Sequence, residues 1–184
     1  MINNKSDLKL YLQKDKESLG INRRFPIPFF DIIWKYERRL RKTEYFLNTN
    51  KKLRYIFSRI LLKEISIKLN ISIPLNVFDY GLCIVHYGTI VVNDTCRVGK
   101  NCRIQEGVTI GATNGVKQGP RLGDNVYLGS GCKIIGDIFV ASNVQVGAGA
   151  VVVKSINDSG TTRAGIPAKK ISDHDSKMNI PYRI

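Results

Sequence analysis

An aliphatic side chain returns every six residues through much of the second half of the chain. The positions are Val92, Val98, Ile104, Ile110, Leu122, Leu128, Ile134, Val140, Val146 and Val152. A second series of apolar or small residues, each four places after a member of the first, consists of Cys96, Cys102, Val108, Val126, Cys132, Ile138, Val144 and Ala150. Turn-forming residues such as Gly, Asn, Asp and Ser occupy positions between them.

A six-residue period is a multiple of the two-residue period of a strand and not of the 3.6-residue period of a helix. The repeated side chains therefore share one face of short strands. Consecutive units can keep that face buried by stacking coil on coil, so the pattern predicts a mainly β domain over residues 71–171, a parallel β-helix of hexapeptide repeats. Three of its inward positions hold cysteine and Cys83 lies in a similar apolar run, so we expect four buried thiols rather than disulfides.

Residues 112–121 interrupt the repeat, because they are rich in turn formers and lack the inward aliphatic residue. We predict an external loop near 112–121, and long loops on regular scaffolds often carry binding function. The polar residues 172–184 are predicted to form a loosely attached C-terminal tail.

Residues 1–70 follow a helical pattern instead. Apolar residues at three- and four-residue steps predict helices over about 7–19, 29–47 and 51–69. Prolines predict an extended connector over 25–28. We expect a short α-helical N-terminal segment that lies beside the first coils of the β-helix.

The formal charge of +14 is concentrated in this helical segment, where residues 1–70 hold 17 Lys and Arg against 7 Asp and Glu. Such a surface suits phosphorylated ligands, an anionic membrane or nucleic acid, and a plain solvated basic face is the alternative. Without a recognised nucleic-acid module, we expect no nucleic-acid partner. The sequence has no transmembrane-length apolar window and no signal-peptide pattern, so we expect a cytoplasmic protein. Peripheral contact of the basic helices with the inner membrane face is left open.

The stretch from Ile73 to Ala168, with its closing Ala164-Gly165-Ile166-Pro167-Ala168-Lys169, resembles the left-handed β-helix acyltransferases. Within them it is similar to the serine acetyltransferases and their relatives in polysaccharide gene clusters. The resemblance implies a left-handed β-helix, acetyl-CoA as co-substrate, no metal, and a homotrimer with its sites between subunits. The related carbonic anhydrases need three His ligands, which the two histidines of this chain do not supply.

The resemblance also gives His86 the role of catalytic base, whereas a histidine beside a strand end is by itself more often structural. In the resembled enzymes a histidine at this place takes the proton of the acceptor hydroxyl as the oxygen attacks the thioester, a task that suits imidazole at neutral pH. By position, Gly111 and Ala112 offer N–H donors for the oxyanion. The residue that orients His86 is expected near Ser72 or Asp79. His174, in the polar tail, is read as a surface residue.

The same resemblance implies a coenzyme A groove. Its expected lining is Gly111, Ala112, Ser130, Ala148, Gly165 and Pro167, with Arg163, Lys169 and Lys170 as phosphate contacts. For any one of the three cations, a plain surface role is the alternative.

Departures from the serine acetyltransferase pattern bear on the acceptor. Val85 stands where those enzymes have an aspartate before the histidine, and Gln118-Gly119 stands where they have Arg-His. Asp15 keeps the spacing of an acidic segment of the serine enzymes, which makes it a candidate acceptor contact. Tyr87, next to His86, and Gln118 are also predicted to contact the acceptor. A free amino acid needs partners for both its ammonium and its carboxylate, and losing most of them disfavours serine.

The sequence therefore predicts an acetyl-CoA-dependent O-acetyltransferase that modifies a hydroxyl of a sugar or saccharide precursor, as in capsule or O-antigen synthesis. A serine O-acetyltransferase of cysteine biosynthesis is the alternative. A β-helix binding protein without catalysis is a third interpretation.

Overall fold

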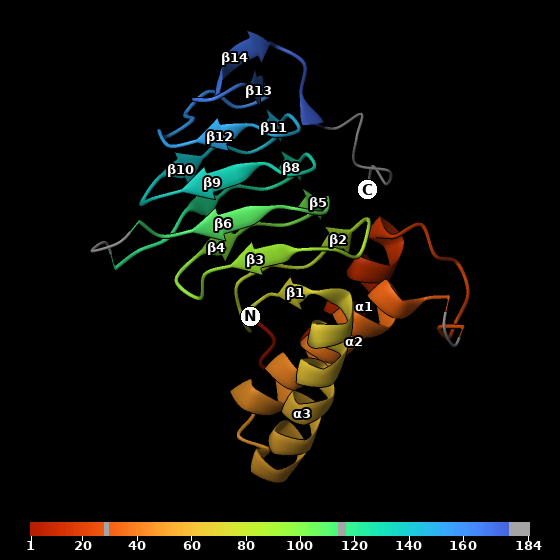
Figure 1. Cartoon of the computed structure of the whole chain (residues 1–184). Helices are drawn as coiled ribbons and strands as arrows, with labels where there is room; N and C mark the ends of the chain where they lie inside the picture. Colours follow the sequence, from red (N-terminus) through yellow and green to blue (C-terminus); the bar gives the residue numbers. More distant parts are fainter. Residues whose placement is uncertain (28–29, 114–116, 177–184) are drawn as a thin grey trace.

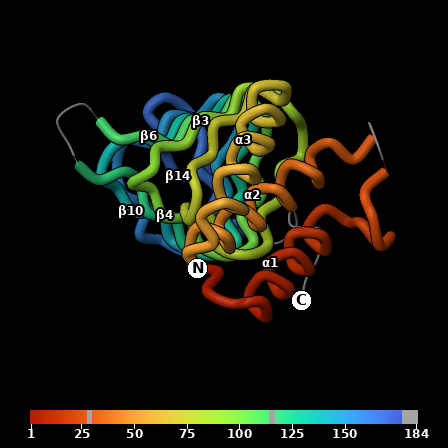
Figure 2. The backbone as a smooth tube through the Cα atoms, turned by 90° about the horizontal axis from the view of Figure 1, so that it is seen from below, coloured from red at the N-terminus to blue at the C-terminus, as the bar shows by residue number. Residues whose placement is uncertain are grey.

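The structure is a computed structural model, which describes residues 1–27, 30–113 and 117–176. Three helices come first: α1 (Lys5–Ser18), α2 (Ile32–Asn48) and α3 (Lys52–Leu69). Short strands follow, from β1 (Ile71–Ser72) to β14 (Lys169–Ser172). Figure 1 shows the helices at one end of a stack of coils and β14 at the other, and in Figure 2 α2 and α3 lie across the helical end.

The strands between these two are short segments spaced along successive coils. They are β2 (Cys83–Ile84), β3 (Ile90–Val92), β4 (Arg97–Val98), β5 (Arg103–Ile104), β6 (Thr109–Gly111), β7 (Arg121–Leu122), β8 (Tyr127–Leu128), β9 (Lys133–Ile135), β10 (Phe139–Val140), β11 (Gln145–Val146), β12 (Val151–Val152) and β13 (Thr162–Ala164). Of the predicted loop near 112–121, residues 114–116 lie outside the described part and Arg121 belongs to β7. Its other residues lie between β6 and β7.

The strands form three sheets, each of which is one side of the coil. The first sheet has the order β1-β3-β6-β9-β12, the second β10-β7-β4, and the third β14-β13-β11-β8-β5-β2. Pairing between coils is parallel, and only the β13–β14 hairpin at the end is antiparallel within the described chain. Each coil passes from the third sheet to the first and then to the second, which confirms the predicted parallel β-helix.

The interior of the coils is the hydrophobic core. Every member of both six-residue series is at most 8% exposed. The four cysteines are free and buried, as predicted, and burial raises the pKa of Cys96 to about 11 and that of Cys83 to about 12. Full burial of each aliphatic side chain contributes about 1.5–3 kcal/mol, so the repeat itself supplies much of the stability.

A ladder of asparagines turns the chain from the second sheet into the third. Asn101, Asn125 and Asn143 each have a left-handed backbone, with φ of 55°, 55° and 61°. Asparagine tolerates this conformation better than other residues with a Cβ atom. Asn101 donates to Asn125 at 3.0 Å and Asn125 donates to Asn143 at 3.0 Å, so the turns stack on one another as the strands do.

Two predicted segments differ from the structure. α2 begins at Ile32, after Asp31 rather than near residue 29, and residues 28–29 lie outside the described part. The start of the predicted loose tail is docked, because Ser176 is fully buried and its backbone N–H donates to the Asn143 carbonyl at 3.1 Å. The sequence missed this contact because its partner is a backbone group, which leaves no trace in residue type; residues 177–184 lie outside the described part.

Candidate active site

The register of the third sheet aligns one residue from each successive coil. The paired residues are Ile84, Ile104, Leu128, Val146 and Arg163. Two positions beyond these come His86, Glu106, Ser130, Ala148 and Gly165. We call this set the His86 column, and it runs along the edge where the chain turns from the third sheet to the first. Three residues expected to line a coenzyme A groove thus share one edge with the expected base.

His86 is exposed and lines a cleft of about 210 Å³ together with Tyr87, Asp31 and Trp34. Residues of α2 and of the preceding connector form one wall of this cleft, and the end of β2 forms the other. In the described part of the chain the imidazole has no hydrogen-bond partner, so it is free to meet a ligand.

Glu106 is a member of the column that the sequence analysis missed. A hydrogen bond from Ser130 and, more weakly, the charge of nearby His86 lower the pKa of its carboxyl group. Asp79, one of two residues expected to orient His86, instead accepts a hydrogen bond from the Tyr11 hydroxyl at 2.6 Å. The sequence signal for Glu106 is that it follows the inward residue Ile104 by two positions, as His86 follows Ile84 one coil earlier.

Gly111 and Ala112 lie at a different edge of the β-helix. Gly111 ends β6, pairs with Ile135 of β9, and leads into the turn from the first sheet to the second. The width of the first sheet therefore separates these two residues from the His86 of the same chain. One chain alone does not bring the expected base and the expected oxyanion donors together.

The expected phosphate contacts gather on the terminal hairpin, beyond the last coil of the column. Arg163 pairs with Lys170 in the β13–β14 register, and Ala164 pairs with Lys169. Arg163 also binds the Asp158 carboxylate at 2.8 Å, and Lys170 binds Asp173 at 2.5 Å. Gly165 and Pro167 lie in the exposed turn of this hairpin, so cationic and small residues share one end of the groove edge.

The three predicted acceptor contacts are not brought together within one chain. Tyr87 is 68% exposed beside His86, and Gln118 is exposed between β6 and β7, at the far edge of the first sheet. Asp15 is only 2% exposed. A role of Asp15 at the acceptor stays a prediction that would require its present contacts to open.

Those contacts form a buried ionic network that joins the helices to the first coil. Asp15 accepts from Arg41 at 2.7 Å and from the backbone N–H groups of Gly81 and Leu82 at 2.8 and 3.0 Å. Glu37 of α2 accepts from the Ile84 N–H at 2.9 Å. Burial raises the pKa of both carboxyl groups. The network fixes β2, the strand that leads directly to His86.

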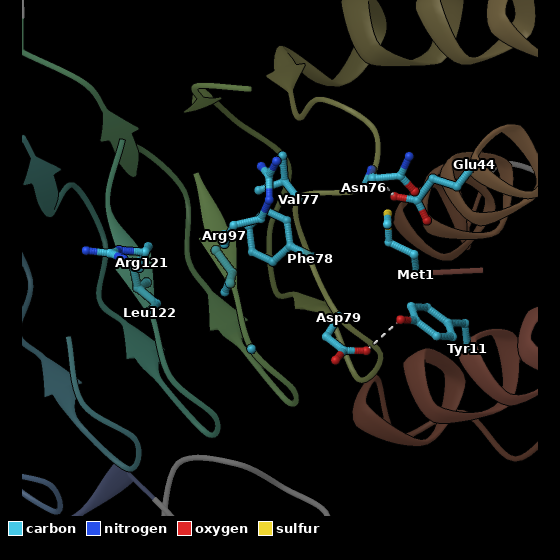
Figure 3. Close-up of a pocket in the computed structure, with 12 residues that line it drawn as sticks. Met1, Tyr11, Glu44, Asn76, Val77, Phe78, Asp79, Arg97, Arg121 and Leu122 are labelled. Atoms are coloured by element: carbon cyan, nitrogen blue, oxygen red, sulfur yellow. Dashed lines mark hydrogen bonds between the residues drawn. The ribbon is translucent and has the colours of Figure 1, made fainter. Parts of the chain in front are cut away.

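A larger cleft, of about 330 Å³, lies where α1 meets the second sheet (Figure 3). Its walls include the Tyr11–Asp79 hydrogen bond and the side chains of Arg97 and Arg121. It contains no histidine, and the His86 column lies elsewhere. Size alone therefore does not identify the reactive site.

In the described residues no group of three His, Cys, Asp or Glu side chains is placed to hold a metal ion. Across the same residues, no helix is both long and apolar enough to span a bilayer.

Proteins similar to this chain include serine acetyltransferases of several staphylococci, and no protein-family model matches it. A serine acetyltransferase of Staphylococcus xylosus is 37% identical over 135 residues, which cover 72% of this chain and 62% of that protein. The chain thus spans less than two thirds of the length of this curated relative, and 48% of that from Staphylococcus epidermidis.

Two solved structures extend the similarity to most of the chain. Serine acetyltransferase from Brucella abortus in complex with coenzyme A is 26% identical, with a TM-score of 0.75, over 92% of this chain and 70% of that one. The Neisseria gonorrhoeae enzyme in complex with serine is 25% identical, with a TM-score of 0.69, over 89% and 69%. These matches support a left-handed β-helix and the family of left-handed β-helix acyltransferases.

The matches also correct the expected acceptor. The relatives are serine acetyltransferases, which overturns the saccharide interpretation and favours the serine alternative. The prediction gave too much weight to Val85 and Gln118, two positions that differ from the serine pattern. Side chains supplied by another element can replace missing partners, and a comparison of single positions does not detect this.

Proposed function

We propose that this protein is an acetyl-CoA-dependent serine O-acetyltransferase that works as a homotrimer. The His86 column carries the proposal, because one exposed imidazole is followed by a carboxylate and then by small residues, and the line ends at three cations. The serine acetyltransferases similar to this chain, one bound to coenzyme A and one to serine, support the same assignment.

In the proposed reaction His86 acts as general base. Its neutral imidazole takes the hydroxyl proton of L-serine while that oxygen attacks the acetyl carbonyl carbon. The tetrahedral intermediate then collapses, the C–S bond breaks, and the coenzyme A sulfur leaves and receives the proton from the imidazolium. O-acetylserine and free coenzyme A are the products, and no redox step is involved. The carboxylate of Glu106, next in the column, favours the transient imidazolium.

The column also suits the long, polar coenzyme A molecule. Ala148 and Gly165 present little side chain, which leaves the backbone of successive coils open to a ligand. At the end of the line, Lys169 is exposed and lies beside Arg163 and Lys170. Cations at this place suit phosphate groups, so we propose that the thioester end of acetyl-CoA lies near His86 and its phosphates near the hairpin.

The ammonium and carboxylate of serine need partners, and this chain lacks the aspartate and the Arg-His pair of the serine acetyltransferase pattern. Asp31 lines the cleft that contains His86, and Arg23 donates to the Asp31 carboxylate at 3.0 Å through Nε. Asp31 thus supplies a carboxylate to the cleft of His86, and its partner Arg23 holds a guanidinium next to that carboxylate. The two groups suit an ammonium and a carboxylate. We therefore expect Arg23→Gln to raise the KM for L-serine more than it lowers kcat. Arg24→Gln, a change of the neighbouring arginine, is the matched control.

A cleft shared between copies explains why His86 and Ala112 lie at different edges of one chain. We propose that His86 of one subunit faces Gly111 and Ala112 of the next. The test uses two variants, His86→Ala and Ala112→Trp, each inactive alone. When the two are assembled together, activity should return, because some clefts combine an intact His86 with an intact Ala112. Failure to recover activity in verified mixed assemblies would refute a shared site.

The function itself is tested by following free thiol release from acetyl-CoA with L-serine as acceptor. His86→Ala should lower kcat by about 10²–10⁴-fold and keep the fold, since the side chain is exposed. Release that does not depend on serine, or normal turnover by His86→Ala, would sink the proposal. If acetyl-CoA binds but no acceptor is acetylated, the chain is a binding protein without catalysis.

A further inference from the structure

Helix α3 carries two apolar faces, and only one of them is packed. Ser58, Leu62 and Leu69 are buried toward the rest of the protein. The other face is exposed: Leu53 at 85%, Ile56 at 55%, Phe57 at 65%, Ile60 at 62% and Ile67 at 67%. Their spacing of three, one, three and seven residues keeps them on a single stripe of a 3.6-residue helix. We call these five residues the α3 stripe.

The stripe lies at an extremity of the molecule. α3 is at the end of the stack opposite β14, and in the view from below it lies in front of the coils (Figures 1 and 2). Leu53, Ile56, Phe57 and Ile60 form a contiguous exposed apolar surface, which Glu64 separates from Ile67. A surface of this kind marks an interaction site more often than scattered single residues do.

Basic side chains border the stripe along both of its sides. At 100° per residue, Lys52, Arg59 and Lys63 fall on one side, and Arg54 and Lys68 fall on the other. Residues 51–70 hold six Lys or Arg and a single acidic residue, Glu64, which Lys68 binds at 2.6 Å. The border therefore carries a clear positive charge.

We propose that the α3 stripe docks on an anionic lipid surface, a property independent of the catalytic proposal. Apolar side chains would enter the boundary of the acyl chains while the bordering lysines and arginines meet the lipid phosphates, the usual arrangement of an interfacial amphipathic helix. The charge argues against a second copy as the occupant. Two identical stripes face to face would bring two basic borders together, and like charges repel.

Co-sedimentation with vesicles tests the proposal on the full chain. The protein should pellet with vesicles of phosphatidylcholine mixed with phosphatidylglycerol, much less with phosphatidylcholine alone, and be released by salt, which screens exposed charges. Replacing both Leu53 and Phe57 by Gln should weaken binding by about tenfold or more. Arg59→Gln and Lys63→Gln should each weaken it by about fivefold.

Ile171→Gln is the matched control, because Ile171 is 65% exposed on β14 at the opposite end, and it should bind vesicles as the wild type does. Circular dichroism should show the same helix content in every variant. The proposal is wrong if the wild type does not co-sediment with anionic vesicles, or if the double replacement of Leu53 and Phe57 leaves binding unchanged. It is also wrong if those changes reduce the mass of the assembly in light scattering, since the stripe would then be covered by another subunit.

Discussion

Substitution of Arg41 tests how strongly the buried ionic network ties the helices to β2, the strand that leads to His86. Its guanidinium is fully buried and donates to the Asp15 and Glu44 carboxylates, at 2.7 and 3.1 Å. It also donates to the carbonyls of Phe78 and Asp79, at 2.8 and 2.7 Å. Arg41→Met keeps most of the aliphatic stem and removes every one of these donors.

The change leaves two buried carboxylates without their cation. Removing one partner of a buried pair costs about 3–5 kcal/mol, which for a chain of this length lowers Tm by about 6–20 °C. Urea unfolding and calorimetry at one protein concentration measure the loss. Lys68→Met is the control, because it removes an exposed ion pair of 63% and 57% side-chain exposure and should leave the midpoint nearly unchanged.

The cost of Arg41→Met should also depend on pH. Burial already raises the pKa of Asp15 and Glu44 in the folded protein, and losing Arg41 raises both further. A carboxyl group with a raised folded pKa favours folding when protonated, so stability falls as pH rises from its unfolded pKa, about 4, toward the folded value. The deficit should therefore be small near pH 4 and larger at neutral pH. A deficit that is large and equal at both would refute the electrostatic explanation.

Two further predictions concern the coils. Gly129→Ala should lower the free energy of unfolding by about 1–3 kcal/mol, because a Cβ there would lie 2.7 Å from the Ala148 backbone nitrogen. Gly111→Ala is the control: its Cβ would make only ordinary contacts, at 3.6 Å, so this variant should melt like the wild type. Equal melting temperatures for the two would contradict this packing. The four cysteines should not react with a disulfide reagent at pH 8 until the protein unfolds, since all are buried and burial raises the pKa of Cys132, for example, to about 12. Rapid reaction of the native protein would show that the coils open.

The position of His86 relative to its neighbours illustrates what the sequence did not reveal. The spacing along the chain between members of the His86 column changes from coil to coil, because loops of different length intervene. A fixed period therefore finds the inward residues and misses Glu106 beside His86. Likewise, Asp15 and Arg41 are 26 residues apart on different helices, and their residue types alone do not predict that they pair.

The sequence by itself determined the coil and its interior, because the six-residue period is a local property and each inward residue reports its own burial. It also singled out His86, through resemblance of the surrounding motif. Only the tertiary structure decided which residues share an edge, which acidic groups are buried with Arg41, and which apolar face of α3 stays exposed. These three features depend on strand register and on how the helices pack against the coils. Both bring together residues that are distant in sequence and that shield one another from water.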